Sequence, residues 1–238
     1  MNLLLFGASG MVGQGVLREA LAAPDVQRVC CVVRHPLGIN HPKLVEWVLP
    51  TLALTEADAL AQARAAAGPG MVAAEDPLAG FDACFFCLGV SAAGLGEAEY
   101  TRWNHDLPLA WCRAWAHSNP GGVLTYVSGA GCDRSEQGRV MWARVKGRTE
   151  NALLRLPVRQ AAMFRPGVIQ PLDGIRSLTP AYRWFYTLSA PLLPLLRRLM
   201  PHAILSTRSV GRAMLAVARQ GHSPPVLETA DIARLGAA

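Results

Sequence analysis

The stretch NLLLFGASGMVGQG, residues 2–15, decides the fold of this chain. Its first residues have the composition of a buried strand, and a helical pattern follows the glycines. Gly7, Gly10 and Gly13 stand between the two, which is typical of a dinucleotide-binding turn. Gly7 allows the tight turn, Gly10 lets the backbone approach a pyrophosphate, and Gly13 lets the helix pack closely on the strand. The free N–H groups of that helix would then face phosphates.

Short apolar runs alternate with helical patterns along the rest of the chain. The predicted strands are residues 2–6, 28–33, 43–48, 83–88, 123–128 and 161–166, and the predicted helices are 11–23, 55–67, 97–118, 140–156 and 209–221, with a last short edge element at 225–232. Strands that are apolar throughout are typical of a parallel sheet covered on both faces. The sequence therefore predicts an α/β, Rossmann-type, doubly wound parallel sheet in a single domain, 1–238. Its dinucleotide-binding core would be 1–168, and 169–238 would form a substrate-side region and last helix.

Composition describes a compact soluble protein that is long enough to bury a core: 238 residues, 51% hydrophobic and 17% charged. Cys84 and Cys87 lie three residues apart on one predicted strand and would point to opposite faces, so a shared metal or a disulfide is not expected. The histidines show no metal-ligand spacing, and neither a nucleophile elbow nor a P-loop occurs. With reduced cysteines and no recognisable secretory signal, the predicted location is cytoplasmic.

Positive charge is concentrated in the second half of the chain. Residues 1–120 hold 7 Lys/Arg and 11 Asp/Glu, whereas residues 121–238 hold 16 Lys/Arg and 6 Asp/Glu. A basic half suits a phosphorylated cofactor, an acidic substrate, an anionic membrane surface or nucleic acid, and ordinary solvated helix faces explain it equally well. Sequence-specific binding of nucleic acid is not predicted.

The residue that follows the second predicted strand bears on the choice of dinucleotide. NAD sites usually place Asp or Glu there, which accepts hydrogen bonds from the adenosine ribose. This chain has Arg34 and then His35, with no acid before Glu46. A guanidinium cannot accept a hydrogen bond but matches a 2′-phosphate, with Ser9 as a second donor. The sequence therefore favours NADP(H) over NAD(H), and a merely solvent-facing Arg34 is the alternative.

An uncharged run of 13 residues, Trp184 to Leu196, lies within a leucine-rich and aromatic segment. Prolines at 191 and 194 and its short length exclude a bilayer span. Residues 175–205 are therefore predicted to cover a small-molecule substrate or to form a homodimer contact. A membrane-surface contact through 184–198 is less favoured.

Five segments in this order resemble the short-chain dehydrogenase/reductases, in their atypical and extended, epimerase/dehydratase-like branches. They are GASGMVG (7–13), CLGVS (87–91), YVSGAG (126–131), WARVKGRTE (142–150) and FRPGVIQP (164–171). The likeness covers nearly the whole chain and is strongest to NAD(P)-binding proteins of the Tat-interacting-protein type.

The resemblance implies that Ser128 hydrogen-bonds a substrate carbonyl, that Trp142 replaces the family's acid/base tyrosine, and that Lys146 holds the nicotinamide ribose. Trp142 and Lys146 are four residues apart and share a helix face. In the intact motif the lysine lowers the tyrosine pKa, so that a phenol can transfer a proton near neutral pH. An indole N–H only donates, so Trp142 can orient a carbonyl or stack on a ring but cannot shuttle protons. The candidate cofactor-binding residues are Gly7, Ser9, Gly10, Met11, Val12, Gly13, Arg34, Leu88, Gly89, Lys146 and Pro166.

Other residues near the predicted site are candidates to replace the tyrosine. Tyr126 lies two residues before Ser128, although an ordinary buried strand aromatic is the favoured interpretation. Asn104 matches an Asn that the family often has near its site, and structural roles are favoured for Asn104, Tyr100 and His105. Two functions remain open. The chain is an NADP(H)-dependent oxidoreductase or epimerase-like enzyme for a small carbonyl or sugar-like substrate, or it is a catalytically impaired NADP(H)-sensing regulatory or interaction module.

Overall fold

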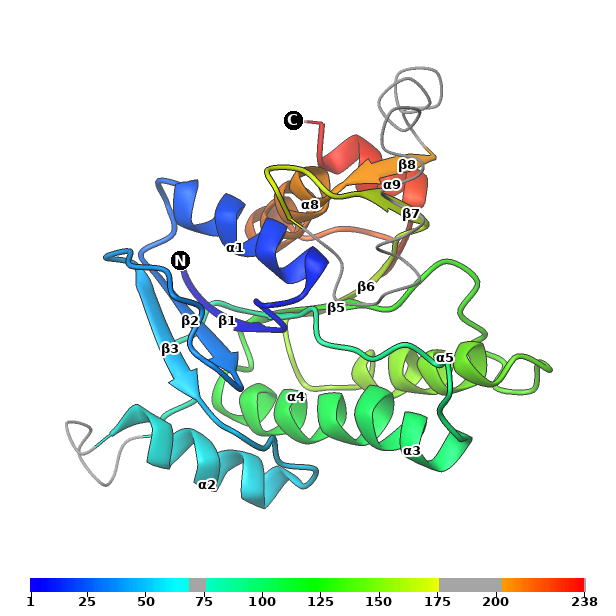
Figure 1. The fold of residues 1–238 in the computed structure, drawn as a ribbon, viewed down its shortest axis with the longest axis horizontal. Helices are drawn as coiled ribbons and strands as arrows, with labels where there is room; N and C mark the ends of the chain where they lie inside the picture. The colour runs from blue at the N-terminus through cyan, green and yellow to red at the C-terminus, as the bar shows by residue number, and fades with distance from the viewer. Residues whose placement is uncertain (69–75, 176–202, 238) are drawn as a thin grey trace.

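The computed structural model describes residues 1–68, 76–175 and 203–237. One sheet of seven parallel strands runs through it in the order β3-β2-β1-β4-β5-β6-β9 (Figure 1). These strands are β1 (Asn2–Phe6), β2 (Arg28–Val33), β3 (Leu44–Val48), β4 (Ala83–Phe86), β5 (Val123–Val127), β6 (Gln160–Arg165) and β9 (Val226–Glu228). A separate parallel pair joins β7 (Val168–Gln170) to β8 (Ile204–Ser206). The predicted doubly wound parallel sheet in a single domain is confirmed.

Helices cover both faces of the sheet, with α1, α8 and α9 on one side and α2, α4 and α5 on the other (Figure 1). The helices are α1 (Met11–Ala22), α2 (Glu56–Ala67), α3 (Glu97–Thr101), a π-helical turn η1 (Arg102–Asp106), α4 (Leu107–Ser118), α5 (Met141–Leu153), α8 (Thr207–Gln220) and α9 (Thr229–Leu235). Successive strand residues feed two hydrophobic cores: Leu3 and Leu5 enter one, and Leu4 and Phe6 enter the other. Because both faces are covered, the strands are apolar throughout.

The strand order reverses between β1 and β4, and the carboxyl ends of the strands at this topological switch point are called the crevice. From β1 the chain proceeds outward to β2 and β3, and then returns to the other side of β1 as β4. Connections from the carboxyl ends of β1 and β4 therefore diverge, which is where open α/β sheets bind ligands. The segments that follow β1, β2, β4, β5 and β6 all lie at this edge, since the strands are parallel.

The C-terminal part of the chain completes the domain. β9 pairs with β6 as the predicted edge element, and α8 packs directly on α1. A Cβ at Gly15 of α1 would lie 2.5 Å from the Thr207 carbonyl oxygen, so only glycine permits this approach of the two helices. The described portion of 169–238 thus contributes to the main core.

Residues 97–118 form the predicted helix but contain the π-helical turn η1. Pro108 explains the turn, because proline lacks an N–H and its ring clashes with the carbonyl four residues earlier, which is that of Asn104. The freed Asn104 carbonyl accepts hydrogen bonds from Thr149 Oγ1 at 2.8 Å and from the Tyr126 hydroxyl at 3.3 Å. The turn therefore ties this helix to α5 and β5 beside the crevice.

The prediction that residues 175–205 cover a substrate or form a dimer contact falls almost entirely outside the described residues, and so does the membrane-surface contact predicted through 184–198. Within the described ranges no helix is long and apolar enough to span a bilayer. The same residues contain no cluster of three or more His, Cys, Asp or Glu side chains that could hold a metal ion. All six cysteines lie in described segments and are unpaired thiols.

Candidate cofactor and active site

The glycine turn after β1 has the geometry that a dinucleotide-binding turn requires. Gly7 has a φ of +81°, and a Cβ on it would lie 2.6 Å from the backbone nitrogen of Leu88. A Cβ on Gly13 would lie 2.0 Å from the Gly7 carbonyl oxygen. Glycine is therefore obligatory at both positions, the first for its backbone conformation and the second for close packing.

The first turn of α1 leaves its N–H groups available. Gly10 is the N-cap and supplies no side-chain cap, and the first turn carries no acidic residue. The N–H groups of Met11 and Val12 have no partner four residues earlier in the helix, as at every helix start. This turn fits a pyrophosphate, because unsatisfied N–H groups and the positive end of the helix dipole favour an anion.

Arg34 follows β2 and is exposed beside this turn. Phe6 pairs with Val32, so Gly7 and Arg34 continue from neighbouring strand ends. Within the described ranges Arg34 makes no hydrogen bond or ion pair. The next acid, Glu46, lies inside β3 and accepts a hydrogen bond from the Leu37 N–H at 3.1 Å. No carboxylate therefore follows β2 where an NAD site would place one.

The remaining candidate cofactor residues lie at the same edge. Leu88 and Gly89 follow β4, and a Cβ on Gly89 would lie 3.5 Å from Lys146 Nζ. Pro166 follows β6, and its carbonyl accepts a hydrogen bond from the Ala130 N–H at 3.0 Å. Ser9 is exposed in the glycine turn. The structure thus brings the predicted cofactor residues to the ends of adjacent strands.

Lys146 is buried at the floor of the crevice. Its Nζ donates to the carbonyl oxygens of Ser128, at 3.0 Å, and Val127, at 3.4 Å, and lies 5.5 Å from the centre of the Tyr126 ring. Burial lowers the pKa of Lys146, and the nearby Cys132 and Glu150 oppose that shift. An ammonium group has three donors, so two backbone contacts leave one for a ligand such as a ribose hydroxyl.

Ser128 belongs to a buried polar network that sequence reasoning missed. Its Oγ donates to Glu150 Oε1 at 2.6 Å and lies 3.1 Å from the Phe164 carbonyl oxygen. The Glu150 side chain is 0% exposed and accepts two hydrogen bonds from Arg165, one from Nε at 2.9 Å and one from Nη2 at 2.5 Å. Glu228, at 3.0 Å from Arg165 Nη1, carries the network to the surface.

A signal for Glu150 was present in the sequence. It follows Trp142 by eight residues and Lys146 by four, so all three lie on one face of α5. A carboxylate on the face that carries the site, together with Arg165 ahead of Pro166, identifies an ion pair behind the crevice.

Trp142 lies half-buried in the first turn of α5, over the loop that follows β5. A Cβ on Gly131 would lie 3.7 Å from Trp142 Cη2. In the described part of the chain the indole N–H makes no hydrogen bond. Among the described residues, Trp142 therefore lies over this loop with an unbonded indole N–H and no ionisable group.

Tyr126 is a fully buried strand aromatic and does not replace the missing tyrosine. Its hydroxyl donates to the Asn104 carbonyl, and burial raises its pKa well above the usual value. Asn104 is itself buried, with its side chain bonded to the backbone of Val90 and Tyr100. His105 Nδ1 pairs with Thr149 Oγ1 at 3.1 Å, and burial lowers its pKa. These residues hold the π-helical turn in place.

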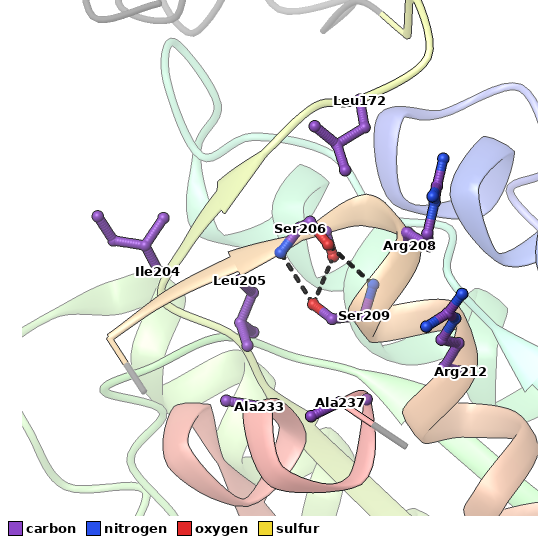
Figure 2. A pocket seen from close by; sticks show the side chains of 10 residues that line it. Leu172, Ile204, Leu205, Ser206, Arg208, Ser209, Arg212, Ala233 and Ala237 are labelled. Carbon is purple, nitrogen blue, oxygen red and sulfur yellow. Dashed lines mark hydrogen bonds between the residues drawn. The ribbon is translucent and has the colours of Figure 1, made fainter. Parts of the chain in front are cut away.

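A cavity of about 390 Å³ lies elsewhere, between β8, α8 and α9 (Figure 2). Figure 2 shows Ser206 and Ser209 bonded to each other as the capping box of α8. Both arginines that line the cavity form ion pairs, Arg208 with Asp173 at 2.9 Å and Arg212 with Glu19 at 3.0 Å. Among the described residues, the lining of this cavity includes no predicted site residue and no unpaired charged side chain, so the crevice at the strand ends remains the candidate site.

Several solved structures with this architecture are short-chain dehydrogenase/reductases. An oxidoreductase of that family from Burkholderia thailandensis superposes with a TM-score of 0.63 at 17% identity, over 97% of this chain and 91% of the other. The chain has the short-chain dehydrogenase/reductase fold. A short-chain dehydrogenase from Burkholderia cenocepacia in complex with NADP superposes with a TM-score of 0.59 at 17% identity, over 98% of this chain and 89% of the other. The enzyme WbmH of Bordetella bronchiseptica in complex with NAD+ superposes with a TM-score of 0.60 at 14% identity, over 92% of this chain and 72% of the other.

Sequence comparison finds relatives among fungal proteins. The mitochondrial protein FMP52 of Eremothecium gossypii is 30% identical over 171 residues, which are 71% of this chain and 66% of that protein. The mitochondrial protein fmp52-2 of Aspergillus oryzae is 28% identical over 241 residues, covering 98% and 95%. No family model matches the chain.

The names of these relatives contradict the cytoplasmic location predicted from the sequence. That prediction was wrong because it rested on reduced cysteines and a missing secretory signal. Free thiols argue against an oxidising compartment, but they do not select among the reducing ones.

Proposed function

We propose that this protein is an NADP(H)-binding oxidoreductase of the short-chain dehydrogenase/reductase type, acting on a small carbonyl or sugar-like substrate. The observation that carries the proposal is Arg34. It is an exposed guanidinium without a described partner that follows β2 beside the glycine turn, where an NAD site would have a carboxylate. A guanidinium matches a phosphate through two parallel hydrogen bonds.

The residues divide the binding of the cofactor among them. The first turn of α1 would hold the pyrophosphate, Arg34 with Ser9 the 2′-phosphate, and Lys146 the nicotinamide ribose. When bound, the cofactor supplies or accepts a hydride. Ser128 and Trp142 then orient the reacting oxygen, and neither one ionises near neutral pH.

A regulatory or interaction module that binds NADP(H) without turnover is the second candidate. Trp142 favours it, because general acid catalysis supplies about 10²–10⁴-fold in rate and an indole cannot provide it. Substrate-dependent oxidation of NADPH over a panel of small carbonyl compounds separates the two functions.

Titration calorimetry with NADPH and NADH tests the cofactor assignment. A hydrogen bond to a charged group contributes about 1.5–3 kcal/mol, so Arg34→Ala should weaken NADPH binding roughly ten- to hundredfold and leave NADH nearly unchanged. Arg155→Ala is the matched control, because Arg155 is also exposed but follows α5 at the opposite edge of the sheet. Equal losses for both cofactors in Arg34→Ala would reject the assignment.

A further inference from the structure

The Ser128 hydroxyl has one proton, and its two oxygen partners can only accept it, while the Cys132 thiol, which also interacts with this hydroxyl, is a weak donor and acceptor. Glu150 Oε1 lies at 2.6 Å and the Phe164 carbonyl oxygen at 3.1 Å. The carboxylate cannot turn away, because it is fully buried and Arg165 holds both of its oxygens. The shorter bond to a charged acceptor is the stronger one, so the proton points into the protein.

This arrangement determines what Ser128 offers to a ligand. Ser128 is half-buried at the end of β5, and with its proton turned inward its oxygen offers lone pairs to a ligand that reaches it. A carbonyl oxygen placed there would face another acceptor, whereas a hydroxyl group would donate to it. Trp142 has the opposite character, since an indole N–H only donates.

We infer that Glu150 is a positioning residue that fixes Ser128 as a hydrogen-bond acceptor, so that this subsite selects an alcohol or sugar hydroxyl over the corresponding carbonyl. A hydroxyl can donate to Ser128, which a carbonyl cannot do. The inference rests on the proposed function, because it names the ligand group that would bind beside Lys146, the lysine proposed to hold the nicotinamide ribose.

Glu150 acts by orientation and not as a proton acceptor. Moving a proton through Ser128 onto the carboxylate would disrupt two charge-assisted hydrogen bonds to Arg165 in a buried site. The same ion pair that fixes the direction of the Ser128 hydroxyl therefore opposes such a transfer.

A neutron structure of the deuterated full-length protein tests the orientation directly, without any ligand. We expect the Ser128 deuteron on the line from Oγ to Glu150 Oε1. A deuteron directed into the crevice would overturn the inference.

Binding of matched probes tests the selectivity. Cyclohexanol with cyclohexanone, and 2-butanol with 2-butanone, are titrated by ligand-observed NMR in the presence of NADP(H). The wild type should bind each alcohol about two- to tenfold more tightly than its ketone, the value of one neutral hydrogen bond. Tighter binding of the ketones, or binding of no probe, would overturn the assignment.

Three variants locate the effect. Ser128→Ala should abolish the preference, and Glu150→Gln should reduce or reverse it, because a side-chain amide can donate to Ser128 and release its proton toward the crevice. Ser118→Ala is the control, since Ser118 also donates to a carboxylate, Asp76, but does so at the C-terminal end of α4. If Glu150→Gln fails to fold, Ser128→Ala still decides, and a preference that survives Ser128→Ala contradicts the inference.

The two experiments distinguish a failure of the proposed function from a failure of this inference. If calorimetry detects no NADP(H) binding while the Ser128 deuteron points at Glu150, the cofactor assignment is wrong and the orientation stands. If NADP(H) binds and the deuteron points into the crevice, the inference alone is wrong.

Discussion

Arg165 provides an internal comparison between a buried and an exposed ion pair. The same guanidinium contacts Glu150, whose side chain is 0% exposed, and Glu228, whose side chain is 55% exposed. Removing one partner of a buried pair costs about 3–5 kcal/mol, because an uncompensated charge remains, whereas an exposed pair contributes about 0–1 kcal/mol. Glu150→Ala should therefore destabilise the protein several times more than Glu228→Ala.

Urea and thermal unfolding followed by circular dichroism measure the difference. For a chain of this size about 1 kcal/mol corresponds to roughly 2–4 °C in Tm, so Glu150→Ala should lower Tm by about 6–20 °C and Glu228→Ala by at most about 4 °C. The double variant Glu150→Leu/Arg165→Met should cost less than Glu150→Ala, because it leaves no buried charge. Equal costs for the two glutamates would refute the reasoning.

Three further outcomes follow from the structure. Gly13→Ala should destabilise the fold and abolish NADP(H) binding in calorimetry, because the added Cβ would lie 2.0 Å from the Gly7 carbonyl oxygen. This clash outweighs the helix preference for alanine over glycine, which is about 1 kcal/mol. Gly121→Ala, with no atom within 4 Å of the added Cβ, is the control and should do neither. Burial raises the pKa of the Cys132 thiol to about 11 and of the Cys30 thiol to about 12, from 9.0. The thiols of the unfolded chain therefore lose their protons first, and the urea midpoint of unfolding should fall as pH rises above about 9. Cys30→Ala and Cys132→Ala should make that fall less steep, and an unchanged pH profile would contradict the raised pKa values. Trp142→Tyr should raise NADPH-dependent carbonyl reduction, whereas Trp142→Phe should not; equal rates in both variants would show that the added phenol does not act as the acid.

Much of the fold could be predicted from short-range patterns. Strands 2–6 and 28–33 match β1 and β2 residue for residue, because buried parallel strands are continuous apolar runs bounded by polar or glycine positions. The N-terminus of α2 was marked by Thr55, which accepts a hydrogen bond from the Asp58 N–H, and its end by Gly68 with a φ of +80°. Local chemistry fixes such boundaries, so the sequence reveals them.

Features that depend on contacts between distant segments could not be predicted in the same way. The π-helical turn required Pro108, which was visible, but also the Thr149 and Tyr126 hydroxyls that satisfy the freed Asn104 carbonyl. The strands β7 and β8 have three residues each, too few for any periodic pattern. The spacing of Glu150 from Lys146 places it on the site face of α5, but its partners Ser128 and Arg165 come from β5 and β6 and are brought to it only by the tertiary packing.

The residues around the crevice limit how a proton could reach or leave a substrate. In the described part of the chain, the Trp142 indole can only donate and the Tyr126 hydroxyl is buried and bonded to backbone. The Ser128 hydroxyl donates a hydrogen bond to Glu150, whose carboxylate is held by Arg165. The described residues therefore include those proposed to hold a dinucleotide, whereas none of Trp142, Tyr126 and Ser128 supplies a group for proton transfer. Such a site should bind cofactor and a hydroxyl ligand with ordinary affinity and turn over slowly, so affinity and rate must be measured separately.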